Sequence, residues 1–246
     1  MNLENRHIIV TGAGAGIGLG IARQCIAAKA RVTGFDISDT AADQLAQIGA
    51  DFVPVDVSEA SGFAAAIRSA TENAGQLDGL VNNAGVTIQA PLAKLSTDQM
   101  EKMWGINQRS VLVGCQTAAG LLGRGGAIVN IASNHARCTD AGSEAYAGTK
   151  GAIVAMTRAM AWSLGPQGIR VNALCPGMTR TEIVEDAMRD PALDAKFRGW
   201  GADNEVSTVD EIGKVAVFLL SDAAMALNGS DVVADRGMSA RLGANF

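Results

Sequence analysis

The chain has 246 residues, of which 48% are hydrophobic and 18% charged, and its formal net charge is −5. This length suits one large α/β unit, and the absence of any run rich in Lys and Arg predicts no nucleic-acid partner. No apolar stretch reaches the roughly 18 residues of a membrane span, and the polar N-terminus leads straight into a strand, so we expect a cytoplasmic protein with no signal peptide and no membrane partner.

Short apolar runs alternate with longer amphipathic segments along the whole chain. The predicted strands are residues 7–11, 30–36, 51–55, 80–82, 127–131, 170–174 and 231–234, and the predicted helices are residues 17–29, 40–47, 60–73, 97–122, 145–164 and 208–220. Nearly continuous apolar strands are typical of parallel strands that helices cover on both faces. Since no linker divides the chain, we expect a doubly wound, Rossmann-type α/β sheet of about seven strands in a single domain, residues 1–246.

A glycine-rich loop follows the first predicted strand. Its glycines are Gly12, Gly14, Gly16 and Gly18, with Ile17 between the last two. Glycine permits a tight turn and lets a pyrophosphate approach the amides of the next helix. The spacing is not the strict GxGxxG, so the loop alone also fits a turn that merely packs against its helix.

Asp36 lies at the end of the second predicted strand and Ile37 follows it. A carboxylate there can accept hydrogen bonds from the adenosine ribose hydroxyls and repel a 2′-phosphate. The glycine loop offers no Arg or Lys that would neutralise such a phosphate. We therefore expect NAD rather than NADP, although an Asp in this place can also serve a turn.

A set of further motifs occurs in one order along the chain. It comprises Thr11-Gly-x-x-x-Gly16-Ile-Gly18, Asp56, Asn82-Asn83-Ala84-Gly85, Asn107, Ser133, Tyr146-x-x-x-Lys150 and Pro176-Gly177. In this order the chain resembles the single-domain branch of the short-chain dehydrogenase/reductase family, from Arg6 to about Met238. The resemblance implies hydride transfer between a nicotinamide and a small secondary alcohol or ketone.

The catalytic residues that the resemblance implies are Asn107, Ser133, Tyr146 and Lys150. Tyr146 and Lys150 are four residues apart on a predicted helix, so they share a face. A phenol is a poor base near neutral pH unless a positive charge favours the phenolate, as the Lys150 ammonium would. Tyr146 is then the acid/base, Ser133 orients the substrate oxygen, and Asn107 organises a water that links to Lys150.

Further cofactor contacts follow from the same resemblance. Tyr146 and Lys150 are expected to contact the cofactor as well, and Lys150 is expected to bind the nicotinamide ribose. The other expected contacts are Asp56 and Val57 at the adenine, Asn83, Ala84 and Gly85 at its ribose, Pro176 and Gly177 before the nicotinamide, and Thr179 and Thr181 at its carboxamide. Four cysteines without CxxC spacing and only two histidines predict no metal site.

The substrate is the least determined part of the sequence. We expect substrate contacts from Asn134, His135, Glu144 and Trp200, and a lid over the site at residues 182–205. Polar groups with one aromatic suit a sugar-like or polyol substrate, but solvated loop charges and a lid-packing Trp explain them equally well. The family resemblance also implies a homo-oligomer, dimer or tetramer, in which helices 97–122 and 145–164 pair between subunits.

Two positions depart from the family pattern. Ala132 stands where a second serine is common, and Arg236 stands in a turn where glycine is common, which puts the usual tetramer contact in doubt. The tail, residues 241–246, either packs on a neighbour or frays.

Three other functions use a similar fold. A catalytically silent NAD sensor would be expected to lack Tyr146 or Lys150. A sugar-nucleotide epimerase usually has a larger C-terminal domain. A 3-oxoacyl ketoreductase would favour NADP and basic residues, which Asp36 and the acidic balance oppose.

Overall fold

The computed structural model describes residues 1–241, and its centre is a seven-stranded sheet in the order β3-β2-β1-β4-β5-β6-β9. The strands are β1 (His7–Thr11), β2 (Arg31–Asp36), β3 (Asp51–Pro54), β4 (Leu77–Asn82), β5 (Leu122–Ile131), β6 (Arg170–Pro176) and β9 (Asp231–Ala234). All neighbouring strands are parallel. The strand order reverses at β1, whose neighbours are β2 and β4, and ligands of such sheets bind beyond the carboxyl ends at that point.

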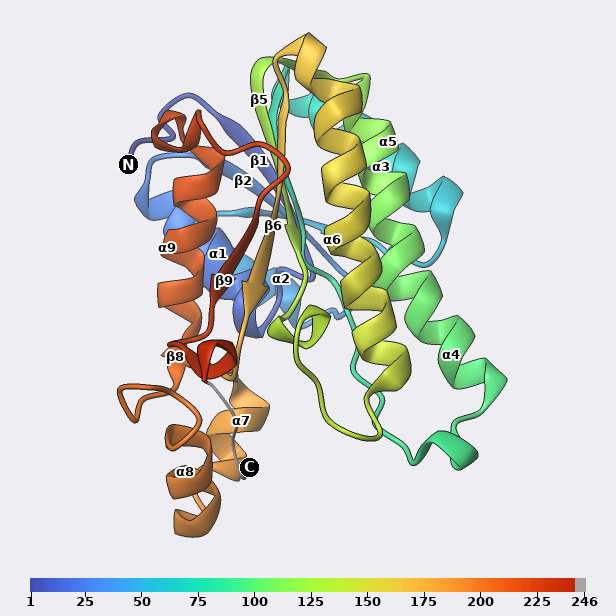
Figure 1. Ribbon diagram of the computed structural model, residues 1–246. Helices are drawn as coiled ribbons and strands as arrows, with labels where there is room; N and C mark the ends of the chain where they lie inside the picture. The colour runs from blue at the N-terminus through green and yellow to red at the C-terminus, as the bar shows by residue number, and fades with distance from the viewer. Residues whose placement is uncertain (242–246) are drawn as a thin grey trace.

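Helices cover both faces of the sheet (Figure 1). One layer contains α1 (Gly16–Ala27), α2 (Ala41–Gln47) and α9 (Val209–Leu220). The other contains α3 (Ala60–Ala74), α4 (Thr97–Met103), α5 (Ser110–Ala119) and α6 (Glu144–Leu164). Each layer packs against its own cluster of buried apolar side chains, which explains why the central strands carry apolar residues toward both faces.

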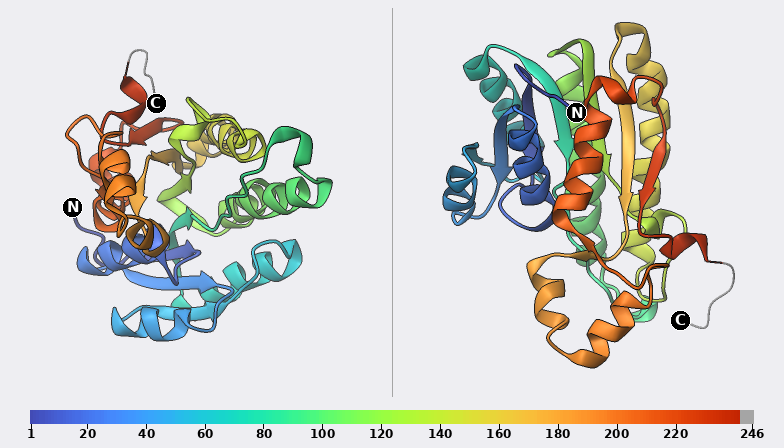
Figure 2. Two further views of the ribbon diagram at one scale, coloured as in Figure 1. Left: turned by 90° about the horizontal axis from the view of Figure 1, so that it is seen from below. Right: turned by 90° about the vertical axis from the view of Figure 1, so that its left-hand side faces the viewer.

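A small lobe extends beyond the carboxyl end of the sheet and carries α7 (Glu182–Ala187) and α8 (Pro191–Arg198) (Figures 1 and 2). At its base β7 (Thr179–Arg180) pairs with β8 (Ser207–Thr208) in parallel. The lobe contains the segment 182–205 that the sequence suggested as a lid.

The expected doubly wound sheet with helices on both faces is confirmed, but one predicted helix was wrong. Residues 97–122 do not form one α-helix. The helix is interrupted by a π-helical turn at Trp104–Arg109 and ends at Ala119, and β5 already begins at Leu122. Leu122 pairs with Leu77 of β4, so a contact with the neighbouring strand, which helical periodicity does not reveal, fixes this boundary.

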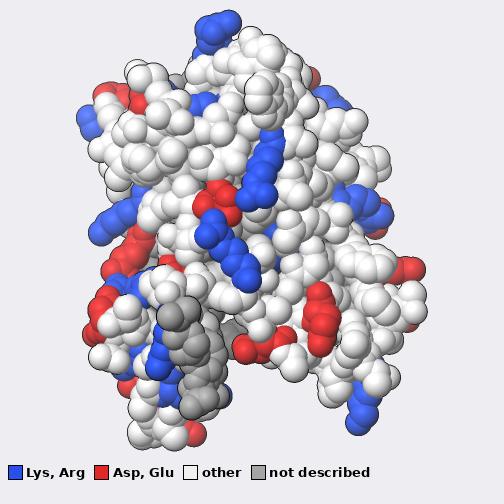
Figure 3. Space-filling model, viewed as in Figure 1, with Lys and Arg blue, Asp and Glu red and all other residues white. Residues whose placement is uncertain are grey.

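The surface carries charges of both signs. On the face shown in Figure 3, basic and acidic side chains are interspersed without a large patch of one sign. Within residues 1–241, no helix has both the length and the apolar character needed to cross a membrane. The sequence left open whether the tail, residues 241–246, packs on a neighbour or frays. Residues 242–246 of this tail lie outside the described part of the chain.

Candidate active site

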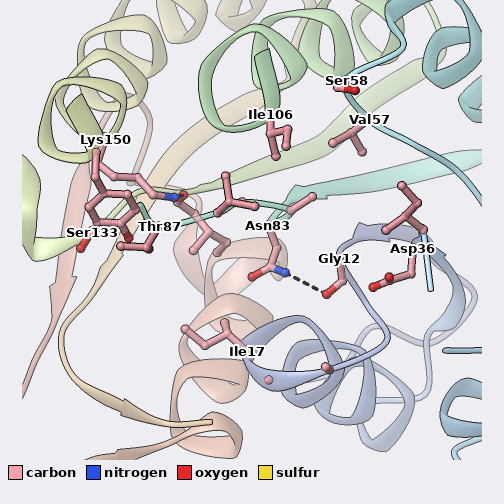
Figure 4. Close-up of a pocket in the computed structure, with 18 of the residues that line it drawn as sticks. Gly12, Ile17, Asp36, Val57, Ser58, Asn83, Thr87, Ile106, Ser133 and Lys150 are labelled. Atoms are coloured by element: carbon pink, nitrogen blue, oxygen red, sulfur yellow. Dashed lines mark hydrogen bonds between the residues drawn. The ribbon is translucent and has the colours of Figure 1, made fainter. Parts of the chain in front are cut away.

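A cavity of about 1170 Å³ opens at the carboxyl ends of the central strands. Figure 4 shows Asp36 at one end, Lys150 and Ser133 at the other, and Gly12 and Asn83 between them. The strand-order reversal at β1 creates the crevice between these groups. The lining of this one cavity includes side chains that the sequence assigned to the cofactor and side chains that it assigned to catalysis.

The glycine loop is held open by the end of β4. Gly12 and Gly16 have φ angles of 62° and 53°, which few residues other than glycine adopt readily. The Asn83 amide donates from Nδ2 to the main-chain oxygens of Thr11 (2.9 Å) and Gly12 (3.1 Å). A Cβ on Gly18 would lie 1.9 Å from the Gly12 oxygen, so Gly18 brings α1 against the loop.

The start of α1 is suited to an anion. Ala15 is the N-cap and provides no side-chain hydrogen bond, and the first turn contains no acidic residue. The first amides of the helix therefore lack the partners that other helices obtain from a capping side chain. Gly16 and Ile17 line the cavity at this point, and a pyrophosphate fits both the free amides and the helix dipole.

Asp36 is fixed in place by two backbone amides. Its Oδ2 accepts from Gly14 (2.8 Å) and its Oδ1 from Ser38 (3.0 Å). Asp36 lines the cavity, and so does Ile37, whose surface is 70% exposed. The carboxylate thus stands in a defined orientation at one end of the crevice, with an apolar side chain next to it.

Ser133, Tyr146 and Lys150 line the opposite end of the cavity. Lys150 is 4% exposed, donates from Nζ to the Ile131 oxygen (2.8 Å), and has Nζ 5.6 Å from the centre of the Tyr146 ring. The bond to Ile131 anchors the ammonium at the end of β5, beside the phenol. Ser133 ends the same segment, and its Oγ accepts from the His135 amide (3.2 Å).

Asn107 lies in the π-helical turn and is fully buried. Its Oδ1 accepts from the Val86 amide and its Nδ2 donates to the Val86 oxygen, both at 2.8 Å. A Cβ placed on Gly85 would lie 3.4 Å from Asn107 Oδ1 and 3.7 Å from Lys150 Nζ, so both groups border Gly85. π-Turns are frequent at functional sites, and this one aims a helix side chain at the loop after β4.

Two titratable groups close to catalytic candidates have altered pKa values, His135 beside Tyr146 and Cys175 beside Ser133. The His135 ring meets the Tyr146 ring edge-on at 5.4 Å, and its partial burial lowers its pKa, which favours the neutral imidazole. Burial raises the pKa of the Cys175 thiol to about 11, so this cysteine beside Pro176 is not a thiolate. Neither group competes with Tyr146 as a charged species.

Most of the expected site residues meet at this cavity. The lining includes Gly12, Gly16, Ile17, Asp36, Ile37, Asp56, Val57, Asn83, Ala84, Gly85, Ser133, Tyr146, Lys150, Pro176, Gly177 and Thr181. Gly14 and Gly18 are not among the lining residues but shape the loop, and Asn107 is buried behind the lining.

The remaining expected residues lie away from the lining. Thr179 is buried in β7, where its Oγ1 donates to the Gly177 oxygen (3.0 Å). Asn134 is buried and donates to the Met238 sulfur, and Glu144 accepts from the Gly142 amide. His135 does not line the cavity but contacts Ser133 through its amide and Tyr146 through its ring, and Trp200 packs on Phe197 with ring centres 5.1 Å apart.

Several lining residues were not expected from the sequence. They are Ala15, Val55, Ser58, Glu101, Lys102, Gly105, Ile106, Arg109, Ile131 and Ala132. The other lining residues, Val86, Thr87, Glu182 and Ile183, belong to the loop 86–95 and the segment 182–205, from which the sequence suggested substrate contacts. Ile106 precedes Asn107 and Ala132 precedes Ser133, so adjacency to a motif was a usable signal. Glu101 and Lys102 of α4 and Arg109 of the π-helical turn gave no such signal.

Comparison with known proteins identifies the class. A family model described as "Enoyl-(Acyl carrier protein) reductase" matches residues 12–239. The chain is 34% identical to 3beta-hydroxysteroid dehydrogenase 2 of Eggerthella lenta over 97% of this chain and 96% of that protein. It is 35% identical to D-threitol dehydrogenase of Mycolicibacterium smegmatis over 96% and 93%. The structure of a short chain dehydrogenase from Burkholderia cenocepacia in complex with NADP gives a TM-score of 0.90 at 31% identity, covering 97% and 99%.

Fold, site and comparisons together define an oxidoreductase with a nicotinamide cofactor. The chain belongs to the short-chain dehydrogenase/reductase family. The predicted family and the predicted reaction class, interconversion of a secondary alcohol and a ketone, are thereby confirmed.

Proposed function

We propose that this enzyme uses NAD, with Tyr146 as the acid/base, to oxidise a hydroxylated secondary alcohol or to reduce the matching ketone. One observation carries the proposal. Asp36, held by two amides, and the trio Ser133, Tyr146 and Lys150 line opposite ends of one cavity. The choice of NAD rests on Asp36, because a 2′-phosphate beside this carboxylate would meet like charge without a compensating cation in the glycine loop.

The residues present fit the dinucleotide along the whole cavity. The uncapped start of α1 would hold its pyrophosphate, Asp36 the adenosine ribose, Lys150 the second ribose, and Thr181 the carboxamide. Asp56 Oδ1 accepts a hydrogen bond from the Ser58 amide (2.8 Å), which holds the carboxylate in place. Asp56 and Val57 would then shape the adenine site. When bound, the nicotinamide accepts or supplies the hydride.

The chain's own residues handle the proton. In oxidation, the Tyr146 oxygen takes the proton of the substrate hydroxyl, and in reduction it returns one to the carbonyl oxygen. The buried Lys150 Nζ lies 5.6 Å from the centre of the Tyr146 ring, so a positive charge stands beside the group that exchanges the proton. The Ser133 hydroxyl holds the same substrate oxygen and stabilises charge on it. Asn107 supports this arrangement from the π-turn.

The lining beyond the catalytic trio favours an uncharged, hydroxylated substrate. Thr87 lines the cavity together with Ser133 (both are labelled in Figure 4), and the lobe contributes Thr181, Glu182 and Ile183 to the lining. Hydroxyl and carboxylate groups can accept hydrogen bonds from further substrate hydroxyls, whereas Glu182 disfavours an anionic substrate. The similarity to a D-threitol dehydrogenase supports a polyol. The aromatic part of the earlier expectation loses its support, because Trp200 packs on Phe197 outside the lining.

We further propose a cytoplasmic homo-oligomer in which residues 182–205 act as a substrate lid within the single domain. Trp104, Leu112 and Trp162 are large apolar side chains exposed on the helices expected to pair between subunits. Light scattering during gel filtration measures the assembly, and a monomer at micromolar concentration would contradict this part of the proposal.

Reduced-nicotinamide absorbance tests the function directly. The purified protein is offered NAD or NADP with polyols, sugars, vicinal diols, hydroxy acids and a 3β-hydroxysteroid. We expect turnover with NAD and a neutral polyol or diol. Faster turnover with NADP would contradict the role given to Asp36, and turnover restricted to the steroid or the hydroxy acids would contradict the substrate class.

A further inference from the structure

The position of the lobe is determined at its base. The chain leaves the sheet after Pro176, passes through β7, α7 and α8, and returns through residues 199–206 to β8. Thr181, Glu182 and Ile183, at the outgoing side, line the cavity. Because β7 and β8 pair with each other, any shift of the returning arm, residues 199–206, moves the cavity-lining residues as well.

Arg236 touches the returning arm with both its backbone and its side chain. It follows β9 in the left-handed conformation, with φ 52°, and its main-chain oxygen accepts from the Ala202 amide (2.8 Å). Its guanidinium donates from Nη1 to Asp203 and from Nη2 to Glu211 (2.5 Å). The side chain is 24% exposed, so both ion pairs are partly shielded from water.

The second partner joins this contact to α9. Glu211 is the third residue of the helix, and its other oxygen accepts from the Thr208 amide (2.7 Å) in a capping box. Thr208 is also the last residue of β8. A single guanidinium therefore connects the returning arm, the β7–β8 base and the start of α9.

The turn at residues 234–239, which contains Arg236, also contacts the loop that precedes the lobe. The Gly177 amide donates to the Ala234 oxygen (3.2 Å), and a Cβ on Gly177 would lie 2.5 Å from Asp235 Cβ. Asp235 is buried and accepts from the Gly237 and Ser239 amides, which fixes the turn. Both ends of the lobe thus meet the 234–239 turn.

Glycine would adopt the backbone of position 236 with less strain, but it would reach neither carboxylate. We propose that Arg236 is a positioning residue, which holds the returning arm so that Thr181–Ile183 stay in the lining of the cavity. The inference rests on the proposed function in one respect, because it takes Thr181 as the residue that contacts the nicotinamide carboxamide. It predicts that Arg236 matters for the nicotinamide half of the cofactor and not for the adenosine half.

Binding of two ligands to four variants tests this. NAD and ADP-ribose, which lacks the nicotinamide, are titrated by calorimetry into the wild type, Arg236→Met, Arg236→Lys and the matched control Arg31→Met. Arg31 forms an exposed ion pair with Asp51 (3.2 Å) at the far end of β2. We expect Arg236→Met to weaken NAD binding about fivefold and ADP-ribose binding less than about twofold, with partial recovery in Arg236→Lys and no change in the control.

Equal losses for both ligands in Arg236→Met, or no loss for either, would overturn the proposal. If Arg236→Met does not fold, Asp203→Asn replaces it, because it removes one of the two ion pairs at a side chain that is 52% exposed. We then expect NAD binding again to weaken more than ADP-ribose binding, but by a smaller factor. Hydrogen exchange of residues 199–206 without ligand separates this proposal from the proposed function. Faster exchange there in Arg236→Met, but not in Arg31→Met, is expected even if the wild type binds no NAD, and unchanged exchange would overturn the contact's role.

Discussion

The side-chain amide of Asn83 donates to the main-chain oxygens of Thr11 and Gly12, so the end of β4 sets the conformation of the glycine loop. A further hydrogen bond joins the same two segments, because the Thr11 hydroxyl accepts from the main-chain amide of Asn83 (2.9 Å). Sequence motifs that are 71 positions apart therefore act as one unit of the cofactor site.

Asn83→Ala removes two hydrogen bonds from the loop. Each contributes about 1 kcal/mol, so we expect NAD affinity to fall about tenfold or more while the fold is retained. Calorimetric titration measures the affinity, with Asn2→Ala, an exposed amide at the N-terminus, as control. Unchanged affinity in Asn83→Ala would mean that the loop holds its shape without this contact.

Asp36→Asn tests cofactor choice. The substitution removes the charge but keeps an oxygen that can accept from the Gly14 amide. We expect the ratio of kcat/KM for NADP to that for NAD to rise about tenfold or more, because repulsion of the 2′-phosphate is lost. A ratio that does not move would assign the preference to another group.

Gly18→Ala is expected to destabilise the protein by about 3 kcal/mol, because the new Cβ would lie 1.9 Å from the Gly12 oxygen. Gly62→Ala is the matched control. Gly62 lies in α3 with its nearest neighbour at 3.9 Å, so alanine there should stabilise the helix by up to about 1 kcal/mol. Urea unfolding measures both, and equal effects would contradict the close approach of α1 to the loop.

His7 makes stability depend on pH. It is buried in β1, where Nδ1 contacts the Gln76 oxygen and Nε2 the Thr33 hydroxyl, both at 2.8 Å. Burial lowers its pKa from 6.5, so just below pH 6.5 the unfolded chain binds more protons than the folded one. The His7 contribution to the free energy of unfolding is full above this pH and declines as the pH falls toward the lowered pKa.

Urea unfolding between pH 5 and 8 measures this slope, which should be smaller in His7→Gln. His135, whose pKa is also lowered, acts in the same direction and leaves a residual slope. An identical slope in His7→Gln and the wild type would show that His7 is not the group responsible.

The sheet and the ordered motifs were predictable from the sequence because they rest on local patterns. Strand β1 is centred on the apolar run Ile8–Val10 and ends at the glycine loop, and Tyr146 and Lys150 share a helix face through their spacing alone. The π-turn around Asn107 was not predictable, since its neighbours fit an ordinary helix and the contacts of Asn107 with Val86 and Thr149 are made across the fold.

The substrate side was the least accessible to sequence reasoning. Trp200 was expected in the site because it is an aromatic residue in the segment 182–205. Its ring packs on Phe197 instead, and no pattern in the neighbouring sequence indicates this contact. Arg236 was recognised only as a departure from glycine. Its partners, Asp203 and Glu211, are 33 and 25 positions away in the chain, so their convergence needed the structure.

Tyr146→Phe gives the most direct test of the central claim, that Tyr146 exchanges the proton during alcohol–ketone interconversion. The measurement is the rate of NAD reduction with the best alcohol of the panel, compared between wild type and variant at equal NAD saturation. We predict a fall in kcat of about 10²–10⁴-fold with NAD affinity nearly unchanged, because only the hydroxyl is lost. A variant that retains the wild-type kcat would contradict the account.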